Sequence, residues 1–198
     1  MNARLPPLPA ALTANLAARY AEPHRHYHTV AHVEALLRHL DAHRTLARQP
    51  AHIEAAIWYH DVVYDTRRND NEICSADIAR FELMSIGWLG IDVERVAGMV
   101  EATRHHRAAD GDTDTLLFLD LDLSVLATGP SEYDAYRDAI RAEFSWAPGT
   151  DYRAGRAKVL RAFLERDAIY RTPELAARWE APARSNLQRE LAVLDQAR

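Results

Sequence analysis

Apolar residues recur along most of the chain at the three- and four-residue spacing of helices that bury one face. A clear example is the stripe Ile53, Ile57, His60 and Tyr64. Proline, glycine and short polar segments interrupt the pattern. It predicts helices over residues 8–20, 29–47, 51–64, 71–86, 92–106, 116–126, 133–144, 151–169 and 182–196. The expected fold class is all-α.

The segment 116–126 is apolar nearly all round, which is typical of a helix buried on every side. Asp120 and Asp122 interrupt it. Residues two apart on a helix point in different directions, so only one of these carboxylates can face a common site. A buried carboxylate is stable only when it is paired or holds a cation. The pattern by itself leaves open which of the two aspartates faces such a site.

Several helix starts carry side chains that can accept a hydrogen bond from the first turn. Asp92 is expected to cap the helix over 92–106, and Asp112 or Asp114 the helix over 116–126. Ser131–Asp134 resembles a capping box with Asp in its last position.

Composition narrows the class of protein further. The chain has 198 residues, of which 48% are hydrophobic, and we expect one domain without an interdomain linker. A net charge of -5 provides no overall excess of positive charge for binding duplex nucleic acid or an anionic membrane surface. One cysteine excludes an internal disulfide and a zinc site made mainly of thiolates. Residues 1–18 lack a signal-peptide pattern, so we expect a cytoplasmic protein.

The chain contains ten histidines, and their spacing decides which of them matter. His28 and His32 are four residues apart, and His60 lies within an apolar stripe next to Asp61. Two imidazoles and two carboxylates form a mixed nitrogen and oxygen ligand set that suits Mn, Fe, Ni, Co or Zn, with Mg also considered. A water on such an ion ionises near neutral pH and becomes a nucleophile. Five histidines are expected at the surface: His24, His26, His39, His43 and His52.

Further polar residues are candidates for contacts with a substrate. His105 and His106 point about 100° apart on a helix, so only one can line a site, and His106 continues the apolar face. His106 is therefore the candidate for binding phosphate or a second metal. Glu72 and Asp65 are candidates to orient an attacking water, although a helix-start charge and a solvated loop explain them equally well. Guanidinium groups match phosphate oxygens, and the candidates here are Arg25, Arg104 and Arg141, each with a surface ion pair as the alternative.

The ordered set of these motifs resembles the HD superfamily of metal-dependent phosphohydrolases, and within it a bacterial family of small predicted HD phosphohydrolases. The resemblance covers nearly the whole chain. It is carried by Arg25–His32, Ala56–Asp65, Asp70–Ala76, Ala102–His106, Leu119–Leu123, Tyr133–Tyr136, Ile140–Phe144, Gly155–Arg156 and Ala183–Leu187.

The resemblance implies an HD-type helical bundle with the metal between core helices, at about 24–128, and additional helices at about 131–196. It implies four metal ligands: His32, His60, Asp61 and Asp122. Asp122 is preferred to Asp120 because Leu-Ser follows it, as in cyclic-nucleotide phosphodiesterases, and because it shares a face with Leu119 and Leu126. On the same analogy His28 is the general acid.

The expected function is therefore hydrolysis of a nucleotide or other small phosphate ester, by attack of a metal-bound water or hydroxide on phosphorus. Two alternatives stay open: an HD-fold di-iron oxygenase, and a non-catalytic metal-containing module that binds a nucleotide. The expected partner is a small phosphate ester, and both a monomer and a homodimer are compatible with the sequence.

Overall fold

A computed structural model describes residues 5–196, and within them the regular secondary structure is helical, without a strand. The predicted all-α class is confirmed. The chain divides into two compact units, Met1–Leu121 and Asp122–Arg198. The expectation of a single domain stays a prediction. Across the described range, no helix combines the length and the apolar composition needed to cross a membrane.

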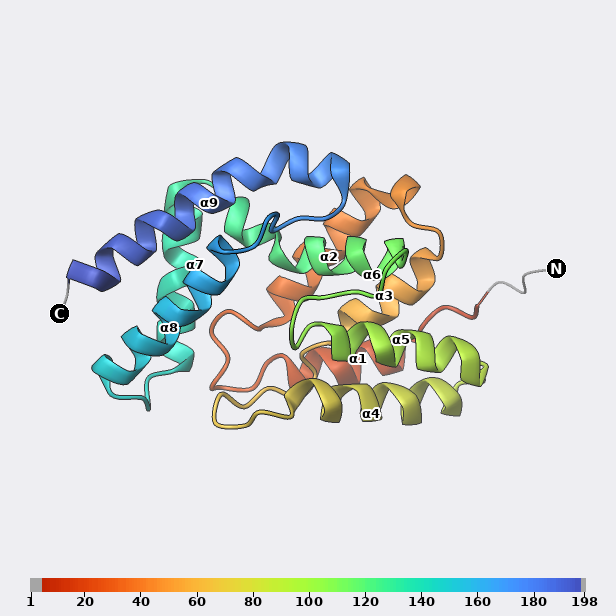
Figure 1. The fold of residues 1–198 in the computed structure, drawn as a ribbon. Coiled ribbons are helices and arrows are strands. Elements are labelled where there is room, and N and C mark those ends of the chain that lie inside the picture. The colour runs from red at the N-terminus through yellow and green to blue at the C-terminus, as the bar shows by residue number, and fades with distance from the viewer. Residues whose placement is uncertain (1–4, 197–198) are drawn as a thin grey trace. The chain divides into compact units, whose positions relative to one another are not determined.

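The first unit is built around a short central helix. Helix α3 (Pro50–Tyr59) begins with proline at its first position, where a missing N–H costs nothing, and continues with alanine and isoleucine. It packs against α1, α2, α4 and α5. Figure 1 shows α4 and α5 side by side as an antiparallel pair. The other helices of this unit are α1 (Ala10–Arg19), α2 (Val30–Ala42), the 3-10 helix η1 (Arg44–Leu46), α4 (Asn71–Ser85), α5 (Gly90–Ala102) and α6 (Thr113–Asp122), whose last residue opens the second unit.

Helix α6 is buried nearly all round, as its sequence predicts. The predicted cap at Asp112 is confirmed, since its carboxylate accepts hydrogen bonds from the Thr115 backbone N–H (3.0 Å) and hydroxyl (2.7 Å). Asp114, the alternative cap, accepts instead from the backbone N–H groups of Arg48 (2.7 Å) and Gln49 (2.8 Å). Those groups directly precede α3, so Asp114 ties the start of α6 to the start of α3.

The second unit consists of η2 (Leu123–Ala127), α7 (Pro130–Glu143), α8 (Gly149–Leu164) and α9 (Pro173–Gln196). Helix α9, the long C-terminal helix in Figure 1, packs against α8 and η2. Two polar side chains fasten η2: Tyr170 donates a hydrogen bond to the Leu123 carbonyl (2.8 Å), and Asn186 donates to the carbonyls of Leu126 (3.0 Å) and Thr128 (2.9 Å).

Several predicted helices end earlier than their apolar patterns indicate. Helix 29–47 stops at Ala42 and continues as η1, helix 51–64 stops at Tyr59, and helix 151–169 stops at Leu164. Helix 92–106 ends at Ala102, and His106 lies in a turn with φ 46°. The segment 116–126 becomes a 3-10 helix after Asp122. An apolar stripe reports burial rather than helical backbone. A buried turn that follows a helix continues the stripe, so the pattern places the helix end too late.

Three predicted helix starts are also wrong. Helix α5 begins at Gly90, so Asp92 lies inside its first turn. Helix α7 begins at Pro130 without a side-chain cap, so Ser131–Asp134 is not a capping box. Helix α9 begins at Pro173 and contains Pro182 in its interior. A proline removes one backbone hydrogen bond, and packing of α9 on α8 and η2 compensates for that loss.

Candidate metal centre

His60 lies directly after the last residue of α3, where its backbone is still helical. The imidazole is 1% exposed, and its Nδ1 donates a hydrogen bond to the Ile57 carbonyl (2.8 Å). Because a carbonyl only accepts, this bond places a ring proton on Nδ1. In the neutral imidazole Nε2 then carries the lone pair, which is the arrangement found in metal-ligating histidines.

His32 lies in the first turn of α2 and is 5% exposed. Its Nε2 lies 3.2 Å from the Nε2 of His60. An ion at about 2.1 Å from each nitrogen would hold the two nitrogens about 3.0 Å apart at a right angle and about 3.4 Å apart at a tetrahedral angle. The observed separation lies within this range, so the pair fits a shared divalent ion.

Asp122 is the last residue of α6 and is half-buried. One of its carboxylate oxygens and one ring nitrogen each of His32 and His60 lie within 4.8 Å of one another. Asp120 is 2% exposed and is not a member of this group. The structure therefore brings Asp122, rather than Asp120, to the two histidines.

Asp61 and His28 lie next to this group. The Asp61 Oδ2 atom is 3.0 Å from the Nε2 of His60 and 3.9 Å from the Nε2 of His28. His28 precedes the first residue of α2, and its ring stacks on that of Tyr64 at 4.2 Å between ring centres. The Asp61 and His28 side chains are each 19% exposed, so both can be reached from solvent.

The donor set is compatible with a divalent ion of intermediate softness. Two imidazole nitrogens come from His32 and His60, and one carboxylate oxygen comes from Asp122. Asp61 is not a member of this group, although its Oδ2 lies 3.0 Å from the Nε2 of His60. Such mixed sites suit Mn, Fe, Co, Ni or Zn. The Nδ1 bond of His60 orients one ligand before any ion binds.

The predicted water-orienting residues lie at the turn before α4 and in its first turn. The Asp65 carboxylate accepts a hydrogen bond from the Arg67 backbone N–H (2.9 Å). The Asn71 side-chain amide accepts from the Asp65 backbone N–H and donates to the Asp65 carbonyl. Glu72 is half-buried in the first turn of α4. Their role toward water stays a prediction.

Of the predicted phosphate ligands, His106 is half-buried, whereas His105 and Arg104 are exposed. The predicted extension of the α5 apolar face to His106 is wrong, because α5 ends at Ala102. In the second unit, Arg141 donates to the carbonyls of Phe144 (2.6 Å) and Ala147 (3.3 Å), which secures the end of α7. Phosphate binding by these residues stays a prediction.

Arg25 requires a correction. Its side chain is 0% exposed, and its nitrogens donate to protein oxygens on every side. The enclosed guanidinium presents no surface to a phosphate, so the predicted substrate contact is wrong. The sequence shows the residue type, but only the folded structure shows that the guanidinium is buried and hydrogen-bonded to protein oxygens.

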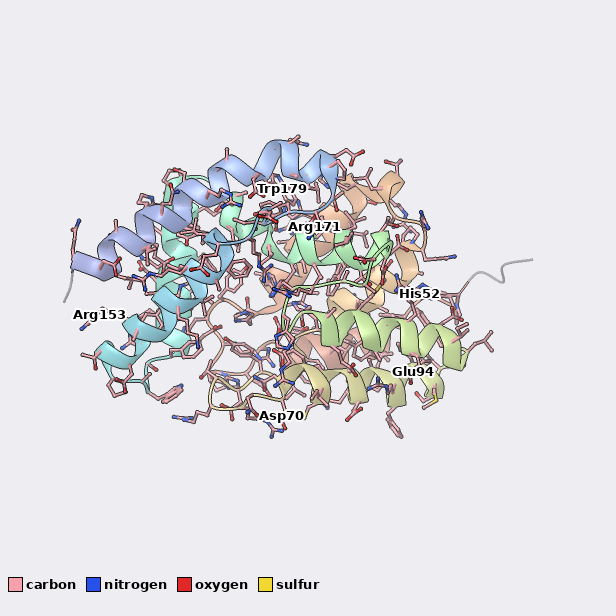
Figure 2. The ribbon with its side chains drawn as sticks, in the orientation of Figure 1. His52, Asp70, Glu94, Arg153, Arg171 and Trp179 are labelled. Atoms are coloured by element: carbon pink, nitrogen blue, oxygen red, sulfur yellow. The ribbon has the colours of Figure 1, made fainter. Side chains whose placement is uncertain are left out.

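His52 is a second correction, since it was expected at the surface. His52, which Figure 2 labels, is 6% exposed. Its Nε2 pairs with the Asp92 carboxylate at 3.0 Å. The pair joins α3 to the first turn of α5. His24 and His26 are exposed as predicted, whereas His39 and His43 are half-buried.

Two residues that support the site were missed from the sequence. The Tyr20 hydroxyl donates to the Trp58 carbonyl (3.1 Å) and accepts from the Asp61 backbone N–H (3.3 Å). The Ser75 hydroxyl accepts from the Val63 backbone N–H (3.1 Å). Ser75 stands within the Asp70–Ala76 motif, which was a signal, whereas nothing in the local pattern singled out Tyr20.

Comparison of the chain with protein-family models, with curated proteins and with solved structures finds no match. The resemblance to HD phosphohydrolases therefore depends on the motifs in the chain, and the functional argument depends on the site.

Proposed function

We propose that the protein is a divalent-metal-dependent phosphohydrolase that acts on a small phosphate ester, with a nucleotide as the expected substrate class. The observation that carries this proposal is the convergence of His32, His60 and Asp122 within 4.8 Å. Asp61 lies outside that group, and its Oδ2, 3.0 Å from the Nε2 of His60, makes it the proposed fourth ligand. A bound divalent ion would act as a Lewis acid toward a phosphoryl oxygen and lower the pKa of a water.

The reaction adds one water across a P–O bond. The water oxygen bonds to phosphorus, the ester oxygen departs, and the water gives up a proton to solvent. His28 protonates the departing oxygen, a role that fits its position 3.9 Å from Asp61 and its partial exposure. Asp65 and Glu72 orient the water, and His106, Arg104 and Arg141 are the candidates for holding phosphate oxygens.

Two buried histidines of the α3 segment provide a matched pair of variants. His60→Gln removes a proposed ligand, whereas His52→Gln changes another buried histidine, which pairs with Asp92 outside the site. Purified proteins are loaded with Mn, Co or Zn, and their metal content is measured. They are then assayed against phosphomonoesters, cyclic nucleotides and nucleoside triphosphates.

The wild type and His52→Gln should retain about one ion per chain and hydrolyse at least one ester, and His60→Gln should lose both properties. Metal and activity retained in His60→Gln would overturn the proposal. Two irons per chain with oxygen-dependent turnover would replace it with the oxygenase. Tight nucleotide binding without turnover would replace it with the binding module.

A further inference from the structure

Arg25 occupies an unusual position for a charged side chain. It lies between α1 and α2 and is 0% exposed. Its Nη1 donates to the carbonyls of Asp61 (2.7 Å) and His28 (3.2 Å), and its Nη2 donates to the carbonyl of Val62 (3.2 Å). Nε donates to the Glu22 carboxylate (3.0 Å). One guanidinium therefore joins the backbone at His28 to the backbone at Asp61.

Aromatic rings complete the enclosure. The guanidinium carbon lies 5.0 Å from the ring centre of Tyr20 and 5.5 Å from that of Tyr64. The Tyr64 ring also stacks on the His28 ring. Arg25 therefore contacts the His28 carbonyl directly and the His28 ring indirectly, through Tyr64. The Tyr20 hydroxyl accepts a hydrogen bond from the Asp61 N–H.

The arrangement has a clear physical cause. Helix α3 ends at Tyr59, and carbonyls beyond a helix end have no helical donor. A buried cation in turn requires acceptors and a counter-charge. Arg25 meets the carbonyls of Asp61 and Val62, and Glu22 supplies the negative charge. Removing the guanidinium leaves these buried acceptors without their donor.

We infer that Arg25 is a positioning residue that sets Asp61 against His28, an inference that depends on the proposed metal site. It contacts neither the substrate nor the reacting atoms. It fixes the backbone on both sides of the 3.9 Å approach between the His28 ring and the Asp61 carboxylate. Arg25 therefore holds the proposed ligand Asp61 and the proposed general acid His28 in position.

The experiment compares Arg25→Gln and Arg25→Lys with the control Arg184→Gln. Arg184 lies within the second unit and makes the same kinds of bond. It donates to the Glu180 carboxylate and to the backbone carbonyls of Leu164 and Arg166. Each full-length protein is titrated with Co²⁺ by calorimetry, and the visible absorption of the bound Co²⁺ is recorded. The free energy of unfolding and the hydrolytic activity are measured in parallel.

Arg25→Gln should weaken Co²⁺ binding by about 10- to 100-fold, the effect typical of residues that orient ligands, and should alter the Co²⁺ absorption. Arg25→Lys keeps the charge but has no planar fork, so we expect partial rescue. Arg184→Gln should lose stability while Co²⁺ affinity and absorption stay unchanged.

The outcomes separate the two proposals. A wild type that binds no metal overturns the proposed function. A wild type that binds Co²⁺ while Arg25→Gln shows the same affinity and absorption overturns only the role of Arg25. If Arg25→Gln does not fold, Arg25→Lys decides, because affinity and absorption equal to those of the wild type would contradict the inference.

Discussion

Replacing Tyr133 by Phe tests a buried polar network in the second unit. Tyr133 is 0% exposed, and its hydroxyl donates to the Glu190 Oε2 at 2.5 Å. Glu190 is 1% exposed and also accepts from the Nε (2.8 Å) and Nη2 (3.0 Å) of Arg156. Burial and the neighbouring Glu190 charge raise the pKa of Tyr133 well above its ordinary value, so the phenol stays a donor.

The structure sets the expected magnitude. A hydrogen bond to a charged group contributes about 1.5–3 kcal/mol, and Tyr133→Phe removes one without opening a large cavity. The Glu190 carboxylate keeps its bonds from Arg156, which limits the loss. We expect the free energy of unfolding to fall by about 2 kcal/mol.

Tyr152→Phe is the matched control. The Tyr152 hydroxyl is buried and has no hydrogen-bond partner among the described residues. Removing an unsatisfied buried hydroxyl relieves a desolvation cost, so this change should leave stability within about 0.5 kcal/mol of the wild type or raise it. Urea unfolding followed by helical circular dichroism measures both variants. Equal losses in the two would refute the assignment of the energy to the Tyr133–Glu190 bond.

Three further predictions concern the Asp112 cap, two glycines and metal binding. Hydrogen bonds from Arg95 hold the pKa of Asp112 at about 2, below its ordinary 3.8. The stabilisation it gives is therefore complete above about pH 4 and is lost as the pH falls toward 2, so Asp112→Asn should cost about 1–2 kcal/mol at pH 7 and much less at pH 2 in urea unfolding. Gly98 is exposed in α5 and an added Cβ meets nothing within 4 Å, so Gly98→Ala should raise stability by about 0.5–1 kcal/mol, whereas Gly87→Ala, at φ +87°, should lower it by about 1 kcal/mol. Thermal unfolding measures both, and a gain at Gly87 would contradict the reasoning. Co²⁺ at a hundred times its Kd should stabilise the wild type by about 2.7 kcal/mol, and an equal thermal shift in His60→Gln would contradict the ligand assignment.

The sequence by itself determined the features that depend on local chemistry. The helical spacing of apolar residues predicted the all-α class, which the described residues bear out. The apolar stripe predicted that His60 is buried, and the place of Asp112 and Asp114 before an apolar segment predicted a cap at one of them, which is Asp112 in the structure. Each of these depends on residues a few positions apart, so the local pattern contains the information.

Tertiary structure alone decided where the helices end and which polar groups meet. Helix α3 ends before His60, and the Tyr20 hydroxyl and the Arg25 guanidinium then bind Asp61 from elsewhere in the chain. These hydrogen bonds join residues separated by 41 and 36 positions, so no local pattern could predict them. Arg25 and His52 were misassigned for the same reason. A charged or polar side chain is stable in the interior when distant groups satisfy it, and only the folded chain shows which groups those are.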